Sequence, residues 1–145
     1  MFELTQLTTY QAGVLQSRAY RELKITMKNI LSPHGLTMMQ WAVLGYVANS
    51  GRNGERVSSL AKELGSTQAF ITNTINSLEE KGYVGRRGDK VDSRAKVVHL
   101  KPGKQRLVNR IELEVRAAMR RELYNRLTPD ELRTYVLVLK KLAGS

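Results

Sequence analysis

The sequence contains no cysteine, which excludes disulfide bonds, thiolate metal sites and thiol-based redox sensing. Its two histidines, His34 and His99, are far apart, and neither has a partner at the spacing of metal ligands, so we expect no zinc site. The acidic residues are scattered, whereas catalysis on nucleic acid needs clustered carboxylates, a metal or an activated nucleophile. We therefore expect no cofactor, no metal and no enzymatic activity.

Long apolar segments are also missing. No apolar run approaches the roughly 18 residues that a membrane-spanning helix needs, and the N-terminus has no signal-peptide pattern. We therefore expect a cytoplasmic protein without a membrane partner.

Acidic residues are scarce relative to basic ones. The chain has 13 Asp and Glu against 24 Lys and Arg, a formal net charge of +11. Such an excess favours a polyanionic partner, which charge alone leaves open as DNA, RNA or an anionic membrane. With 145 residues, of which 41% are hydrophobic, the chain can fold as one domain or as two small subdomains that share a core.

Three amphipathic helices are expected at the two ends of the chain. The first spans residues 5–31 and stops at Pro33 and Gly35, the second spans 104–127, and the last follows a capping box that begins at Thr128. Their apolar residues recur at spacings near three, four and seven: Leu7, Val14, Leu15, Leu23, Met27, Ile30 and Leu31; Leu107, Val108, Ile111, Val115, Ala118, Met119 and Leu123; Leu132, Tyr135, Val136, Leu139 and Leu142. Apolar stripes of this length are most easily covered by a second copy of the chain.

The central helix is expected at residues 38–48. Thr37 and Gln40 have the spacing of a capping box. The helix is apolar nearly all round, so we expect it to be buried on every side.

Residues 57–100 have the order of a helix-turn-helix followed by a wing. We expect Ser58 to cap a short helix that ends at Gly65, and Ser66 to cap a second helix that ends at Gly82. Two short strands, 83–87 and 95–100, then enclose a turn-rich tip at 88–93.

The second of these helices has one apolar and one polar side. At 100° per residue Phe70, Ile71, Ile75 and Leu78 gather on the expected buried face, and Gln68, Ala69, Thr72, Asn73 and Asn76 on the other. Gln and Asn can pair with adenine, and Thr can bond a base or touch a thymine methyl. The acids Glu79 and Glu80 come late, so the N-terminal half would face a major groove. An ordinary solvated face explains the helix alone equally well.

The hairpin that follows decides between these interpretations, because residues 85–110 hold nine basic residues and two acids. Arg86 and Arg87 suit backbone phosphates. At the tip, Asp92 can hold the guanidinium of Arg94 in one pose, which suits a narrow A·T-rich minor groove. The alternative is a turn in which Asp92 caps backbone groups and Arg94 extends into solvent.

Four motifs together resemble the MarR family of multiple-antibiotic-resistance regulators: residues 36–44 (LTMMQWAVL), 60–65 (LAKELG), 78–84 (LEEKGYV) and Asp92-Ser-Arg94. The resemblance covers nearly the whole chain. It implies a homodimeric winged helix-turn-helix transcription factor, often a repressor that a small ligand releases. It would place Thr67, Gln68, Thr72 and Asn73 in the major groove and Arg94, supported by Asp92, in the minor groove. It would also place an aromatic acid near His34, Met38 and Trp41, although a Met/Trp pair on an apolar helix is also typical of a core.

These observations predict a mainly α fold with a small β-wing. Residues 36–100 would form the winged helix-turn-helix, and residues 1–35 and 101–145 a helical dimerisation region. The expected function is that of a dimeric, sequence-specific transcriptional regulator of double-stranded DNA, a repressor acting at a pseudo-palindromic operator. The alternative is an architectural or chromatin protein with little sequence preference. The expected DNA contacts are Ser66, Thr67, Gln68, Thr72, Asn73, Asn76, Arg86, Arg87, Lys90, Asp92, Ser93, Arg94 and Lys96.

Overall fold

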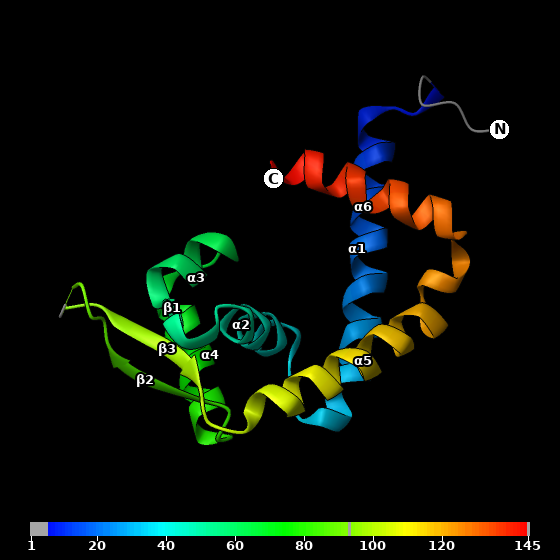
Figure 1. Cartoon of the computed structure of the whole chain (residues 1–145). Coiled ribbons are helices and arrows are strands. Elements are labelled where there is room, and N and C mark those ends of the chain that lie inside the picture. The colour runs from blue at the N-terminus through cyan, green and yellow to red at the C-terminus, as the bar shows by residue number, and fades with distance from the viewer. Residues whose placement is uncertain (1–5, 93, 145) are drawn as a thin grey trace. The chain divides into compact units, whose positions relative to one another are not determined.

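The computed structural model describes residues 6–92 and 94–144 and confirms a mainly helical chain with a small β-wing (Figure 1). The residues Thr5, at the expected start of the first helix, and Ser93, in the wing tip, lie outside the described residues. The elements are α1 (Thr9–Leu31), η2 (Ser32–His34), α2 (Met38–Asn49), η3 (Gly51–Asn53), β1 (Glu55–Arg56), α3 (Val57–Glu63), α4 (Gln68–Glu80), β2 (Val84–Gly88), β3 (Lys96–Leu100), α5 (Lys104–Glu122), η4 (Tyr124–Arg126) and α6 (Pro129–Ala143).

The chain divides into two compact units. One is Leu31–Glu114, and the other joins the two ends of the chain, up to Ile30 and from Val115. The first unit holds the helix-turn-helix, the wing and most of α5. The division of labour between residues 36–100 and a dimerisation region formed by 1–35 and 101–145 stays a prediction.

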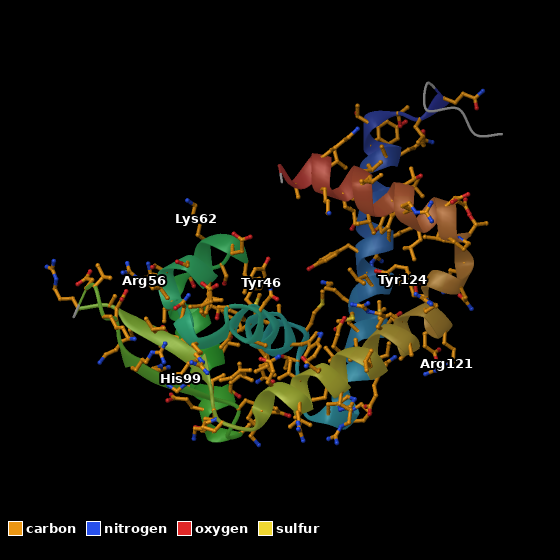
Figure 2. All side chains as sticks on the ribbon, viewed as in Figure 1. Tyr46, Arg56, Lys62, His99, Arg121 and Tyr124 are labelled. Carbon is orange, nitrogen blue, oxygen red and sulfur yellow. The ribbon has the colours of Figure 1, made fainter. Side chains whose placement is uncertain are left out.

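Helix α2 begins with the expected capping box. The Gln40 amide N–H donates to Thr37 Oγ1 at 3.1 Å, and the Thr37 N–H donates to Gln40 Oε1 at 3.0 Å. Val43, Leu44 and Val47 are fully buried. The expectation of burial on every side was wrong, because Tyr46 is 39% exposed and its hydroxyl lies 3.5 Å from Glu63 on α3 (Figure 2). A phenol can keep its hydroxyl at the surface while its ring packs.

The two helix starts in the helix-turn-helix differ from prediction, by two residues for α3 and by one residue for α4. Helix α3 follows Arg56 and has no side-chain cap, so Ser58 is not its N-cap. Helix α4 is capped by Thr67, whose hydroxyl accepts a hydrogen bond from the Phe70 amide at 3.1 Å, so Ser66 is not the N-cap either. Between the helices Gly65 has a φ of 60°, a left-handed conformation that favours glycine.

The wing is a three-stranded antiparallel sheet in the order β1-β3-β2, which adds a short strand to the predicted hairpin. The β1 strand has two residues, Glu55 opposite Val98 and Arg56 opposite Val97. A Cβ at Gly54, which precedes it, would lie 2.5 Å from both Val97 Cγ1 and the Val98 carbonyl oxygen. Only glycine therefore lets the chain approach β3 here.

The C-terminal helices end differently from prediction. Helix α5 stops at Glu122 and does not continue to residue 127, because Leu123 leaves the helical region (φ −129°, ψ −55°) and η4 follows. The capping box of α6 is confirmed, with the Glu131 amide donating to Thr128 Oγ1 at 3.2 Å. Within the described part of the chain, no helix combines the length and apolar character needed to cross a membrane.

Candidate nucleic-acid interface

The outer face of α4 is polar and uncharged, as the sequence predicts. Gln68, Asn73 and Asn76 are exposed and Thr72 is half-buried. The opposite face is buried and consists of Ile71, Thr74, Ile75 and Leu78. Arrangement of amides and hydroxyls on one exposed helix face permits hydrogen bonds to base edges.

Phe70 does not lie on the buried face of α4, contrary to prediction, and is 50% exposed. Thr74 takes the buried position instead, and its hydroxyl donates to the Phe70 carbonyl oxygen at 3.0 Å, which satisfies the buried hydroxyl. The aromatic ring is therefore half exposed in the first turn of α4. An exposed Phe at this position can contact a thymine methyl group.

Arg86 joins the wing to α4. Its Nη1 lies 3.3 Å from Glu79 Oε1, and its Nη2 donates to Asn76 Oδ1 and, at 3.4 Å, to the Thr72 carbonyl. The guanidinium is thus directed at α4, and its side chain is only 28% exposed. Such contacts hold β2 in register with the helix, a different task from the phosphate contact that the sequence suggested for Arg86. Asn76 keeps its amide NH₂ for a base, since its oxygen accepts from Arg86.

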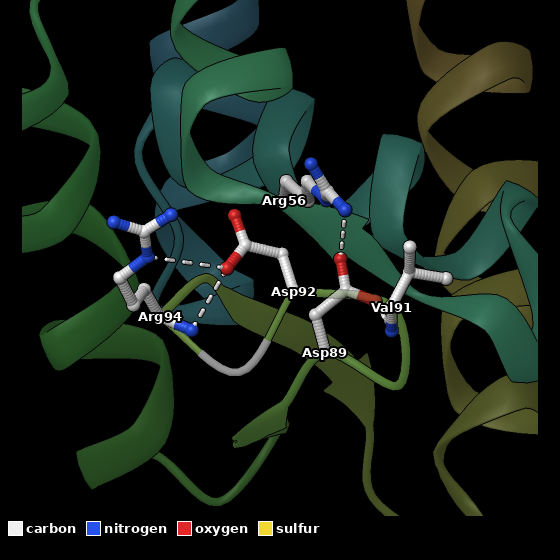
Figure 3. A network of polar contacts seen from close by, with 5 residues as sticks. All are labelled: Arg56, Asp89, Val91, Asp92 and Arg94. Atoms are coloured by element: carbon white, nitrogen blue, oxygen red, sulfur yellow. Dashed lines mark hydrogen bonds and ion pairs between the residues drawn. The ribbon is translucent and has the colours of Figure 1, made fainter.

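At the wing tip, Asp92 contacts Arg94 in two ways (Figure 3). Its Oδ1 accepts a hydrogen bond from the Arg94 amide at 3.0 Å and lies 3.7 Å from Arg94 Nε. The two interpretations of the tip, a backbone cap and a guanidinium support, therefore occur together. The Arg94 side chain is 94% exposed, so it can enter a groove in the DNA without first leaving a buried site.

A second carboxylate, Asp89, fastens the tip to the body of the winged unit (Figure 3). It accepts a hydrogen bond from the Val91 amide at 3.0 Å and forms an ion pair with Arg56 on β1. The Val91 hydrogen bond, aided by the Arg56 guanidinium and opposed by desolvation, lowers the pKa of Asp89 below its ordinary value of 3.8. Arg56 was not predicted from the sequence, because it lies more than thirty positions from the tip.

Replacing Asp89 by Asn is expected to loosen the wing tip and to remove an acid transition from it. Because the pKa of Asp89 is depressed in the fold, its contribution is complete above pH 3.8 and is lost as pH falls through the folded pKa. The amide resonance of Val91, which donates to Asp89, should shift between pH 6 and pH 3 in the wild type and not in Asp89→Asn. Asp130→Asn, on the exposed first turn of α6, serves as the control. A shift that persists in Asp89→Asn would contradict this assignment.

The other predicted DNA contacts lie on the same unit. Arg87, Lys90 and Lys96 are exposed along the hairpin, and Arg87 donates to the Arg52 carbonyl oxygen. Ser66 is half-buried, and its amide donates to the Ala61 carbonyl at 2.9 Å. The hairpin cations and the α4 face thus belong to one compact unit, joined by Arg86.

The predicted ligand residues are only partly brought together. Trp41 and Tyr46 line a groove of about 540 Å³ between α2 and α5. His34 and Met38 do not line it, and His34 Nε2 lies 3.2 Å from Glu114 Oε2. No cluster of three His, Asp or Glu side chains suited to a metal ion occurs among the described residues.

Comparison with known proteins shows which family the chain resembles. Residues 34–95 match the family model described as MarR family. The chain is 25% identical to CouR from Rhodococcus jostii, solved with p-coumaroyl-CoA, with a TM-score of 0.79 and 95% of each chain covered. It is also 25% identical to a mutant MarR from E. coli complexed with operator DNA, with a TM-score of 0.77 and coverage of 90% of this chain and 91% of that one. The chain resembles the MarR family, in sequence over residues 34–95 and in fold over nearly its whole length.

A third relative shares the fold at lower identity. This MarR family transcriptional regulator from a Rhodococcus species is 24% identical, with a TM-score of 0.84, and covers 95% of this chain and 96% of its own. Together with the polar face of α4 and the basic wing, the family match and the relative solved with operator DNA support a DNA-binding regulator.

Proposed function

We propose that this chain is a homodimeric repressor that binds a pseudo-palindromic operator in double-stranded DNA. The observation that carries the proposal is the contact of Arg86 with Glu79 and Asn76, which holds a basic wing against a helix whose N-terminal half is uncharged. Helix α4 would occupy the major groove while Arg94 enters the adjacent minor groove. The E. coli relative solved with operator DNA supports this partner.

Sequence-specific binding is favoured over an architectural role. An architectural protein needs cations along its contact surface and no particular base-reading groups. The exposed face of α4 instead carries amides, a hydroxyl and Phe70. The cations are on the hairpin, which suits positioning of the reading helix on the backbone.

The homodimer is supported by apolar side chains at the surface of α1 and α6. Eleven large apolar or aromatic residues on these helices are at least 39% exposed: Tyr10, Val14, Leu15, Tyr20, Ile25, Tyr135, Val136, Leu137, Val138, Leu139 and Leu142. A soluble regulator gains stability by covering such residues with a second copy. Two copies related by a two-fold axis would match the two half-sites of a palindrome.

The test of this function is binding to a panel of duplexes. An inverted repeat, its half-site alone and scrambled versions would be measured by fluorescence anisotropy with excess competitor DNA at fixed salt. We expect the inverted repeat to bind at least about 10³-fold more tightly than scrambled duplex, the lower limit for specific regulators. Equal affinity across the panel would support the architectural alternative instead.

We further propose a small aromatic-acid effector that binds in the groove lined by Trp41 and Tyr46. The groove volume of about 540 Å³ is in the range of small-molecule sites, and the CouR relative was solved with the aromatic thioester p-coumaroyl-CoA. Because Trp41 is the only tryptophan, millimolar salicylate-like acids should change its fluorescence and weaken operator binding together. Absence of both effects would exclude this ligand class.

A further inference from the structure

The outer face of the wing sheet carries a groove of about 910 Å³, and most of its lining residues, among them Arg52 and Lys101, have no part in the function proposed above. Its floor is formed by Val97, His99 and Leu100, and its sides by η3, the wing tip and the residues that lead into α5. The His99 ring lies over Gly85, where an added Cβ would be 3.1 Å from His99 Cε1. Figure 2 labels His99 on the wing sheet. The absence of a side chain at Gly85 thus leaves room for the His99 ring, which lines the groove.

The charge of this groove is strongly positive. Four cations line it, Arg52, Arg87, Lys90 and Lys101, against one carboxylate, Asp89. Asp89 is already paired with Arg56, which is not among the lining residues. Among the described residues, the side chains of Arg52, Lys90 and Lys101 have no ion-pair partner. Crowded like charges raise the energy of the free protein, and a polyanion would lower it.

The position of the groove on the hairpin indicates which polyanion fits. Adjacent residues of a strand point to opposite faces, so Arg86 is directed at α4 and Arg87 lies on the outer face. A hairpin inserted into a minor groove has one phosphate strand along each face. One DNA strand would then lie on the side of the reading helix α4. The other DNA strand would lie along the basic groove of the protein. Five residues of β2 span roughly 17 Å, against about 3.4 Å between phosphates of one strand along the duplex axis, so several phosphates can be contacted.

We propose that this groove binds the sugar–phosphate backbone of the duplex that flanks each half-site, with Arg52 and Lys101 as contacts beyond the hairpin itself. The inference rests on the proposed DNA-binding function and extends its footprint past the base pairs under Arg94. These contacts add affinity and salt dependence and carry no sequence preference.

The test compares two operator duplexes with the full-length protein. One ends at the base pairs under Arg94, and the other continues by about one helical turn of about 10 base pairs on each side. Wild-type protein should bind the longer duplex more tightly. Arg52→Gln/Lys101→Gln should lose that gain, and its log–log salt slope on the longer duplex should become shallower by about 1.8 per subunit, for two phosphate contacts. Its affinity for the short duplex should stay within about twofold of wild type.

The control is Lys140→Gln/Lys141→Gln on α6, which removes the same charge from the other compact unit. If both double variants behave alike on both duplexes, or if wild type gains nothing from the longer duplex, the proposal is overturned.

A thermal-shift measurement with inorganic pyrophosphate distinguishes a site for small anions from a site for the DNA backbone. Stabilisation of wild type alone, with the gain from the longer duplex retained in Arg52→Gln/Lys101→Gln, would also overturn it. Failure of wild type to prefer any duplex over competitor would show that the DNA-binding function itself has failed.

Discussion

Replacing Arg94 by Ala is expected to weaken specific operator binding by about 1–3 kcal/mol per half-site, and therefore by about 2–6 kcal/mol for a dimer on two half-sites. The reason is that Arg94 is 94% exposed at the wing tip and is supported by Asp92. Loss of a cation that enters a narrow minor groove should also relax the preference for A·T pairs under the wing. The measurement is a salt titration on matched duplexes and on duplexes altered only under the wing.

Two further variants distinguish the orientation of the Arg94 guanidinium from the effect of positive charge alone. Asp92→Ala should weaken binding less than Arg94→Ala but should also relax the A·T preference, because the guanidinium is kept and its support is lost. Lys96→Ala, at the exposed start of β3, should weaken all duplexes alike and make the salt slope shallower by about one unit. If Arg94→Ala gives the Lys96→Ala pattern, with no change in sequence preference, Arg94 contacts only phosphate and the minor-groove assignment is wrong.

Arg86 gives a separate result on the same duplexes. A phosphate contact, as its position in a basic hairpin suggests, would make the salt slope shallower by about one unit on replacement by Ala. The contacts with Glu79, Asn76 and the Thr72 carbonyl instead predict an unchanged slope and a weaker preference under the wing. In that case the wing would have lost its register with α4.

Local patterns in the sequence were sufficient where the stabilising contacts are local. The capping boxes at Thr37 and Thr128 involve partners within a few residues, and both are confirmed. The hairpin strands were also located, because alternating apolar residues and glycines mark their limits. The cap of α4 was misplaced because Ser66 and Thr67 both carry a hydroxyl that can cap a helix, and the backbone dihedrals decide between neighbours. The cap of α3 was misplaced because this helix follows Arg56 and has no side-chain cap.

Contacts between distant residues could not be predicted in this way. The Asp89–Arg56 ion pair depends on the two-residue strand β1, which is too short to give a periodic signal. Gln40 was expected only to complete a capping box, yet its Nε2 donates to Ser77 at 2.8 Å and its Oε1 accepts from Lys81 at 2.9 Å. These bonds hold α2 to α4 and so orient the reading helix. The helical wheel of α4 misplaced Phe70 because the burial of Thr74 requires a hydrogen bond that the wheel does not consider.

Truncation before Thr128, which removes α6, is expected to abolish the dimer and to yield aggregate or unfolded monomer. The exposed apolar residues of α1 would lose the cover that a second copy gives them in the proposed dimer. A monomer would also lack the second DNA-binding unit of the dimer. The high effective concentration of that unit at the second half-site is worth about 10²- to 10⁴-fold in affinity. Light scattering and circular dichroism of the truncated chain measure the two effects separately. A well-folded monomer from this truncation would contradict a dimer built by the terminal helices.

Point variants keep this prediction testable if the truncated chain does not fold. Leu137 and Leu142 are 55% and 74% exposed in the single chain, so Leu137→Asp/Leu142→Asp removes little intrachain packing. In a two-fold dimer each of these leucines would be buried in both copies of the chain. A fully buried leucine contributes about 1.5–3 kcal/mol. The double variant should therefore be a folded monomer with weak operator binding. Lys140→Asp/Lys141→Asp on the same helix introduces the same two acids and should remain dimeric. If both variants dissociate alike, electrostatics and not the apolar stripe of α6 controls assembly.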